Sequence, residues 1–141
     1  MNIVKLKMMM FVVKNESGII SYDDRKTESY YSMLNEITLI EINEEITKIG
    51  DYNMKGLSKV TEIIISETVE RIGMNVFEIC TSLIVINVNS ENEYLISNEG
   101  ILFNQDKTEL IQYPIGNQRT KYTIPKEIER IRIGNKIIVI N

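Results

Sequence analysis

The chain has 141 residues, a net charge of −4 and a pI near 5.0, which fits a single domain without a basic surface for nucleic acid. It contains one cysteine and no histidine or alanine, which excludes histidine-based catalysis and an internal disulfide framework. Abundant isoleucine in the absence of alanine favours strands over helices.

Residues 1–29 are predicted to form an amino-terminal hairpin that caps the fold, followed by a polar connector. The apolar run Met8 to Val13 is expected to be one strand and Ile19 to Tyr22 the other, with a polar turn between them. Basic residues precede the first run, as in a signal peptide, but the run has only six residues and no small-residue cleavage site follows it. We therefore interpret it as a strand.

Two other features bear on location. No segment has the roughly 18 apolar residues of a membrane helix, so no membrane insertion is predicted. Asn15 begins a glycosylation sequon, which has meaning only if the chain is secreted. The sequence leaves a cell-surface and a cytoplasmic location both open.

Residues 30–91 carry an internal repeat. The segment ITKIG at 46–50 returns as VERIG at 69–73, a step of 69 − 46 = 23 residues. Aligning three consecutive 23-residue units gives 23 columns of three residues each. Since 43% of residues are apolar, roughly two of these columns should be wholly apolar by chance. Five columns are: Tyr31/Met54/Phe77, Leu34/Leu57/Cys80, Ile37/Val60/Leu83, Ile40/Ile63/Ile86 and Ile42/Ile65/Val88. A period of this size predicts a solenoid of stacked units.

Each unit is expected to contain a turn, a short irregular or helical arc and a strand. The fold class is thus a β-rich solenoid with a parallel sheet on its concave side, arcs opposite, β-hairpin insertions and few helices. The isoleucines of the strand columns should point inward, with Met54 and Phe77 under the arc. Gly50 and Gly73 are expected at bends that need positive φ. Cys80, in a leucine column, is interpreted as a buried hydrophobe rather than a reactive thiol.

The outward side chains of the predicted sheet form a mixed surface and are the candidate protein-binding site. Strand alternation places them on the concave face. They are Glu41, Asn43, Glu62, Ile64, Ser66, Val85, Asn87 and Asn89.

After Val88 the register breaks. Residues 92–123 are predicted to be a β-hairpin insertion, with apolar runs at Ile101 to Phe103 and Leu110 to Tyr113 around a polar turn. Residues 124–141 are predicted to be a degenerate terminal repeat ending in the strand Ile137 to Ile140. An exposed apolar terminal strand invites pairing, so self-association through Ile137 to Ile140 is an alternative to binding another protein.

Several of these residues carry a family resemblance. Ile72-Gly73, Phe77, Cys80 to Leu83, Ile86 and Val88, with Ile124-Pro125 before Ile128 and Ile131, resemble the BspA-like, or Treponema-type, leucine-rich repeat. The interruption between Gly100 and Pro114 is also similar to one common in that family. The resemblance covers about residues 30 to 131. It implies a protein-binding repeat module, often displayed on the surface of anaerobic bacteria or parasitic protists and linked to adhesion.

No catalytic, cofactor or metal site is predicted. Residues from Asn87 onward superficially suggest a calcium loop, but Asn92 stands where the turn glycine is required and Asn98 where the bidentate glutamate belongs. Adjacent carboxylates such as Glu44-Glu45 are more consistent with solvated loops than with acid–base catalysis. A non-catalytic binding module is therefore the leading hypothesis, a scaffold or self-associating structural protein the second, and an unrecognised hydrolase the last.

Overall fold

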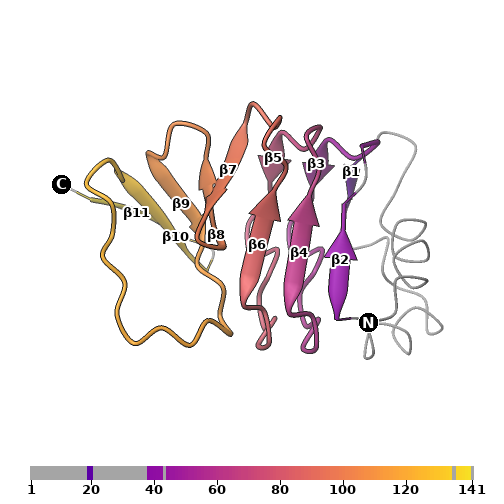
Figure 1. Ribbon diagram of the computed structural model, residues 1–141, viewed down its shortest axis with the longest axis horizontal. Helices are drawn as coiled ribbons and strands as arrows, with labels where there is room; N and C mark the ends of the chain where they lie inside the picture. Colours follow the sequence, from indigo (N-terminus) through magenta and orange to yellow (C-terminus); the bar gives the residue numbers. More distant parts are fainter. Residues whose placement is uncertain (1–18, 21–37, 43, 135, 141) are drawn as a thin grey trace.

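The computed structural model describes residues 19–20, 38–42, 44–134 and 136–140, and within them the regular elements are strands, with no helix. The strands form three sheets, in the orders β1-β3-β5, β2-β4-β6 and β11-β10-β9-β8-β7 (Figure 1). Their bounds are β1 Ile19–Ile20, β2 Leu39–Glu41, β3 Lys48–Ile49, β4 Glu62–Ile65, β5 Arg71–Ile72, β6 Val85–Val88, β7 Leu95–Asn98, β8 Ile101–Asn104, β9 Glu109–Gln112, β10 Arg130–Ile133 and β11 Lys136–Val139. The predicted β-rich architecture with parallel sheets is confirmed.

The two three-stranded sheets are parallel, and their register follows the sequence repeat. Ile40 is paired with Ile63, and Ile63 with Ile86, so the pairing step equals the period (63 − 40 = 23). In the other sheet Ile49 is paired with Ile72 at the same step (72 − 49 = 23). Each repeat therefore adds one strand to each sheet.

Side chains from both sheets and from the arcs fill one core. The inward isoleucines of β2, β4 and β6 are buried as predicted, whereas Val88 is half-buried. Met54 and Phe77 are also buried, beneath the arcs. The buried thiol of Cys80 lies 3.0 Å from the Met54 carbonyl oxygen and donates to it, which supports its interpretation as a packed side chain. Each such buried side chain stabilises the fold by about 1.5 to 3 kcal/mol.

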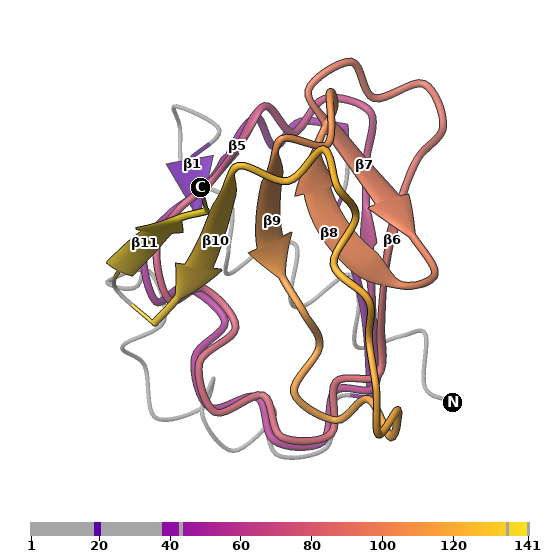
Figure 2. The ribbon, with the colours of Figure 1, turned by 90° about the vertical axis from the view of Figure 1, so that its left-hand side faces the viewer.

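Backbone hydrogen bonds join the arc of one repeat to the arc of the next. The N–H groups of Tyr52, Met54 and Gly56 donate to the carbonyls of Met74, Val76 and Glu78, at 3.0, 3.0 and 2.8 Å respectively. The two arcs follow nearly the same path when viewed along the stack (Figure 2). The stack is thus hydrogen-bonded along its arcs as well as within its sheets.

The prediction for Gly50 and Gly73 is wrong, because neither has a positive φ. A Cβ on Gly73 would lie 2.6 Å from the Asp51 nitrogen and 2.8 Å from the Gly50 carbonyl carbon. Close stacking of consecutive repeats, rather than backbone conformation, therefore explains this glycine. Left-handed residues occur instead inside the arcs, at Tyr52 and at the equivalent Asn75.

Beyond β6 the pairing changes to antiparallel. β8 and β9 pair antiparallel where the sequence predicts a hairpin, and β7 pairs antiparallel with β8. The prediction missed β7. The Ile86 N–H donates to the Gly100 carbonyl at 2.9 Å, which joins this unit to the repeat sheet. A second small core beneath it contains Ile101, Phe103, Leu110 and Ile128.

The ends of the chain are described in part. Of the predicted amino-terminal hairpin, only β1 lies among the described residues, and it pairs parallel with β3. At the other end β10 pairs parallel with β9 and antiparallel with β11, through a tight turn that includes Gly134 at φ 60°. The predicted terminal strand at Ile137 to Ile140 is present one residue earlier, as β11.

Candidate protein-binding surface

The outward side chains of β2, β4 and β6 form rows across the parallel sheet. Leu39 is paired with Glu62, and Glu62 with Val85. Glu41 is paired with Ile64, and Ile64 with Asn87. Since paired residues of a parallel sheet lie side by side on the same face, these rows place apolar and polar side chains next to each other.

The structure places most of the predicted contact residues on this face. Glu41, Asn87 and Asn89 are exposed, and Glu62, Ile64 and Val85 are half-buried at its surface. Asn43 lies outside the described residues. The Asn87 amide donates to the Glu62 carboxylate at 2.9 Å, so these two side chains hold each other in place.

Ser66 differs from the expectation, since it is only 8% exposed. Its hydroxyl lies 3.0 Å from that of Thr68, which in turn donates to the Ile46 carbonyl at 2.8 Å. This local hydroxyl pair draws the Ser66 side chain into the bend after β4. Ser66 therefore contributes to the shape of the site more than to its contact surface.

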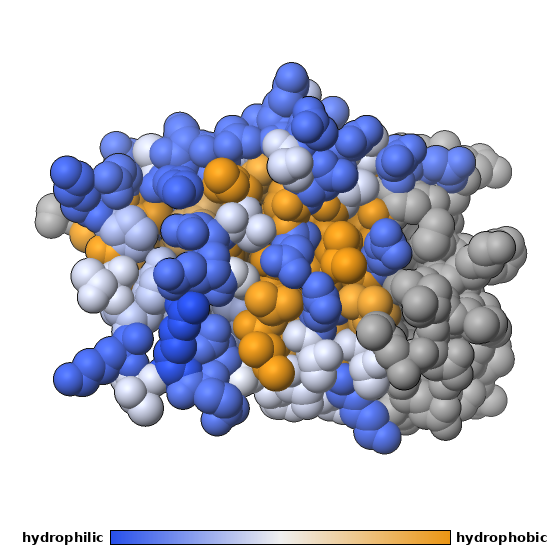
Figure 3. Space-filling model, in the orientation of Figure 1, coloured by the Kyte–Doolittle hydropathy of each residue, from blue (hydrophilic) through white to orange (hydrophobic). Residues whose placement is uncertain are grey.

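Apolar side chains gather at the centre of the face with polar ones among them, and the surface above and to the left of them is hydrophilic (Figure 3). Leu39, Ile64 and Val85, which are half-buried on this face, contribute its apolar area. Exposed apolar area with a polar border is typical of protein-binding surfaces.

A hollow of about 470 Å³ lies where the strands of this sheet end. It brings together four predicted residues, Glu41, Ile64, Ser66 and Asn89, whereas Glu62, Val85 and Asn87 lie outside it. Two more residues of the hollow, Glu44 and Glu45, were not predicted, because adjacent carboxylates are more consistent with a solvated loop. The sequence did contain a sign of their role, since both follow closely after a predicted strand of the binding face.

Asn92 anchors the turn that closes this end of the sheet. Its buried amide nitrogen donates to the carbonyls of Ser66 and Val69, both at 2.9 Å. Its amide oxygen accepts from the backbone N–H groups of Tyr94 and Leu95, both at 2.8 Å. Asn92 thus has an internal structural role, and its only signal in the sequence is a polar residue one period after Val69 (92 − 69 = 23).

In the described part of the chain, the His, Cys, Asp and Glu side chains include no group of three or more placed to hold a metal ion. Nor does that part contain a helix of the length and hydropathy needed to span a bilayer.

Comparison with solved structures shows two similar bacterial proteins. The pneumococcal vaccine antigen PcpA is 26% identical, with a TM-score of 0.56, over 69% of this chain and 30% of its own. A leucine-rich cell surface protein from Faecalibacterium prausnitzii A2-165 is 21% identical, with a TM-score of 0.57, over 70% of this chain and 32% of its own. The chain therefore spans about a third of the length of either protein.

No curated protein matches the chain. The model of the BspA-type leucine-rich repeat region, in 6 copies, matches residues 26–133. This match covers most of the chain and includes every described strand from β2 to β10. The protein belongs to the BspA-type leucine-rich repeat family.

Proposed function

We propose that the protein is a non-catalytic interaction module that binds another protein through the outward face of β2, β4 and β6. The observation that carries this proposal is the apolar centre of that face beside an acidic hollow. Family membership supports it, because stacked repeats use extended sheet surfaces for binding.

The chemistry of the face indicates the kind of partner. Glu41, Glu44 and Glu45 carry negative charge around the hollow, while Ile64, which also lines it, offers apolar contact. A complementary surface has an exposed apolar side chain flanked by Lys or Arg. We infer a protein partner of that composition.

Disrupting the face should abolish capture of such partners. We expect the combined variant Glu62→Ala, Ile64→Asp, Asn87→Ala and Asn89→Ala to weaken binding at least about tenfold, because it removes apolar contact and places a charge at the centre. Pull-down with immobilised wild type identifies the partners, and titration with each purified partner measures affinity.

A matched control replaces four exposed residues outside this face, Lys59, Glu70, Arg71 and Thr81, by alanine. This control is expected to bind as wild type does. Unchanged binding of every captured partner by the first variant would show that the site assignment is wrong.

We further propose that the module is displayed at the cell surface and takes part in adhesion. Two similar proteins support this location, since the Faecalibacterium protein is a cell surface protein and the pneumococcal protein is a vaccine antigen. Labelling of intact cells with a membrane-impermeant reagent tests it, and labelling only after lysis contradicts it.

Self-association is a second candidate function, favoured by the exposed terminal strand. Ile137, Ile138 and Val139 in β11 are all exposed, and β11 lies at the edge of its sheet. Pairing of this edge with a second copy would bury those side chains. We expect light scattering to show a dimer that Ile138→Lys disrupts, whereas a strict monomer at high concentration would rule this candidate out.

A further inference from the structure

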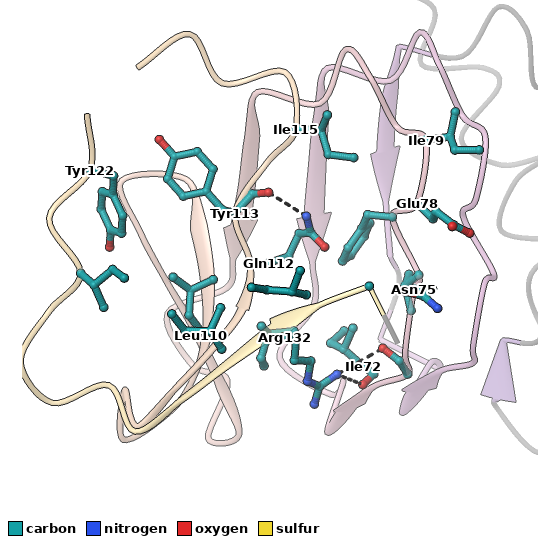
Figure 4. Close-up of a pocket in the computed structure, with 18 residues that line it drawn as sticks. Ile72, Asn75, Glu78, Ile79, Leu110, Gln112, Tyr113, Ile115, Tyr122 and Arg132 are labelled. Carbon is teal, nitrogen blue, oxygen red and sulfur yellow. Dashed lines mark hydrogen bonds between the residues drawn. The ribbon is translucent and has the colours of Figure 1, made fainter. Parts of the chain in front are cut away.

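A groove of about 480 Å³ lies between the second arc and the carboxy-terminal part of the chain (Figure 4). One wall is the arc from Ile72 to Ile79. The other wall contains β9 residues, the segment around Tyr113 and Tyr122, and the end of β10. The groove is separate from the face of β2, β4 and β6, since none of the residues predicted for that face lines it.

The arc wall presents backbone donors that have no acceptor among the described residues. In the first arc, the N–H groups of Tyr52, Met54 and Gly56 bond to the second arc. The equivalent groups one period later belong to Asn75, Phe77 and Ile79, and they make no hydrogen bond in the part of the chain that the structure describes. Both arcs follow nearly the same path (Figure 2), so we infer that these three N–H groups point along the stack as those of the first arc do. Asn75, Phe77 and Ile79 all line the groove.

Ile79 is a strained residue at the rim of this groove. Its φ is 60°, whereas the equivalent position in the first arc is Gly56, at φ 80°. A β-branched residue in this region is an outlier that the surrounding structure must enforce. The side chain is nevertheless 52% exposed, so burial within this chain does not compensate for the strain.

The remaining rim is apolar as well. Ile115, Ile124 and Ile133 are exposed around the groove, at 51%, 45% and 61%. Exposed isoleucines from four separate segments thus surround one opening. Apolar side chains gathered in this way are typical of a recognition site rather than of scattered surface residues.

The two charged side chains that line the groove are each paired with a side chain of opposite charge. Glu78 forms an ion pair with Lys55 at 3.0 Å. Arg132 is paired with Glu109 and donates to the Ile72 carbonyl at 2.6 Å. Burial, with a smaller contribution from Glu99, raises the pKa of the Tyr122 phenol, which therefore stays neutral near pH 7. The groove has no unpaired charge among its lining residues to attract a charged ligand.

We propose that this groove binds an uncharged peptide segment of a partner protein. The segment's backbone carbonyls accept from the N–H groups of Asn75, Phe77 and Ile79, as the second arc accepts from the first. An apolar side chain of the segment enters the groove. This inference goes beyond the function proposed above, because it assigns a second surface with its own kind of ligand.

The matching segment has the path of an arc rather than of a regular strand. The three N–H donors belong to every second residue of an arc in which Asn75 and Ile79 are left-handed. β11, in contrast, is a regular antiparallel strand. The exposed edge of β11 from a second copy is therefore a poorer match than an arc-like segment.

The chain provides a suitable probe, because residues 72–81 carry the carbonyls that accept from the first arc. A synthetic peptide of residues 72–81 with capped ends, carrying Glu78→Gln and Cys80→Ser so that it has no charged group, is titrated into the ¹⁵N-labelled full-length protein. We expect the amide signals of Asn75, Phe77 and Ile79 to shift and their hydrogen exchange to slow at least about tenfold at saturation. A peptide of the same composition in scrambled order is expected to produce neither effect.

Two variants localise the binding. Ile79→Asp should raise the dissociation constant at least about tenfold, and aspartate adopts positive φ more readily than isoleucine, so the fold is retained. Ile124→Asp tests the opposite wall of the groove. Ile84→Asp is the control, since Ile84 is similarly exposed at 49% but lies outside the groove.

Three outcomes would overturn the proposal. In the first, the three amides do not respond to millimolar peptide. In the second, the scrambled peptide acts as the authentic one does, or Ile84→Asp weakens binding as much as Ile79→Asp. In the third, the three amides of the free protein are protected at high concentration and lose protection on dilution, which would show that a second copy occupies the groove.

Discussion

Replacing Asn92 by alanine is expected to lower the free energy of unfolding by about 4 kcal/mol. The substitution leaves the carbonyls of Ser66 and Val69 and the N–H groups of Tyr94 and Leu95 without their side-chain partner. A buried polar group that loses its hydrogen bond costs about 1 to 3 kcal/mol, and local relaxation recovers part of the total. Urea unfolding monitored by circular dichroism measures the change.

Two further variants make this expectation specific. Asn89→Ala removes an exposed asparagine whose oxygen accepts from the Glu91 N–H, and should change stability by less than about 1 kcal/mol. Asn92→Asp keeps the acceptor for the two N–H groups but loses the donor to the two carbonyls, and is expected to be as destabilising as alanine or more. A loss below about 1 kcal/mol for Asn92→Ala would contradict the anchoring role.

Replacing Gly73 by alanine is expected to destabilise the protein by about 3 kcal/mol. The added Cβ would meet backbone atoms of Asp51 and Gly50 at 2.6 and 2.8 Å, and backbone cannot move aside without separating two repeats. Overpacking of this kind costs about 1 to 3 kcal/mol or more. The same unfolding measurement reports it.

Gly56→Ala is the matched control for this second prediction. Gly56 has open space around its Cα but a φ of 80°, so alanine there costs about 1 to 2 kcal/mol of conformational strain without a clash. If Gly56→Ala proves more destabilising than Gly73→Ala, then the positive φ of an arc glycine constrains the repeat more strongly than close stacking of neighbouring repeats does.

The periodic part of the fold could be predicted because one rule governs it. Apolar columns 23 residues apart must stack to bury themselves, and this requirement sets both the parallel pairing and its register, as Ile40, Ile63 and Ile86 illustrate. The same rule placed Cys80 and Phe77 in the core.

The remaining features depend on contacts that a column of residues does not specify. Strand alternation predicts that the Ser66 side chain points outward, yet its hydroxyl contact with Thr68 turns it inward. The spacing of Gly73 indicated a bend, whereas its cause is the approach of the preceding repeat. β7 begins after the register breaks, where no period predicts it. The hollow and the groove arise where several segments meet, so the repeat alone contains no signal for either.

The hydrogen bonds between the arcs give the molecule a polarity. The bonds from Tyr52, Met54 and Gly56 all run from the N–H of the earlier repeat to the carbonyl of the later one. The two faces of an arc are therefore chemically different, as the two ends of a filament subunit are. Any segment that continues the stack beyond Ile79 must present acceptors, and a segment that presents only donors is rejected whatever its side chains. Extension of the stack is consequently directional, because the added segment must supply the acceptors.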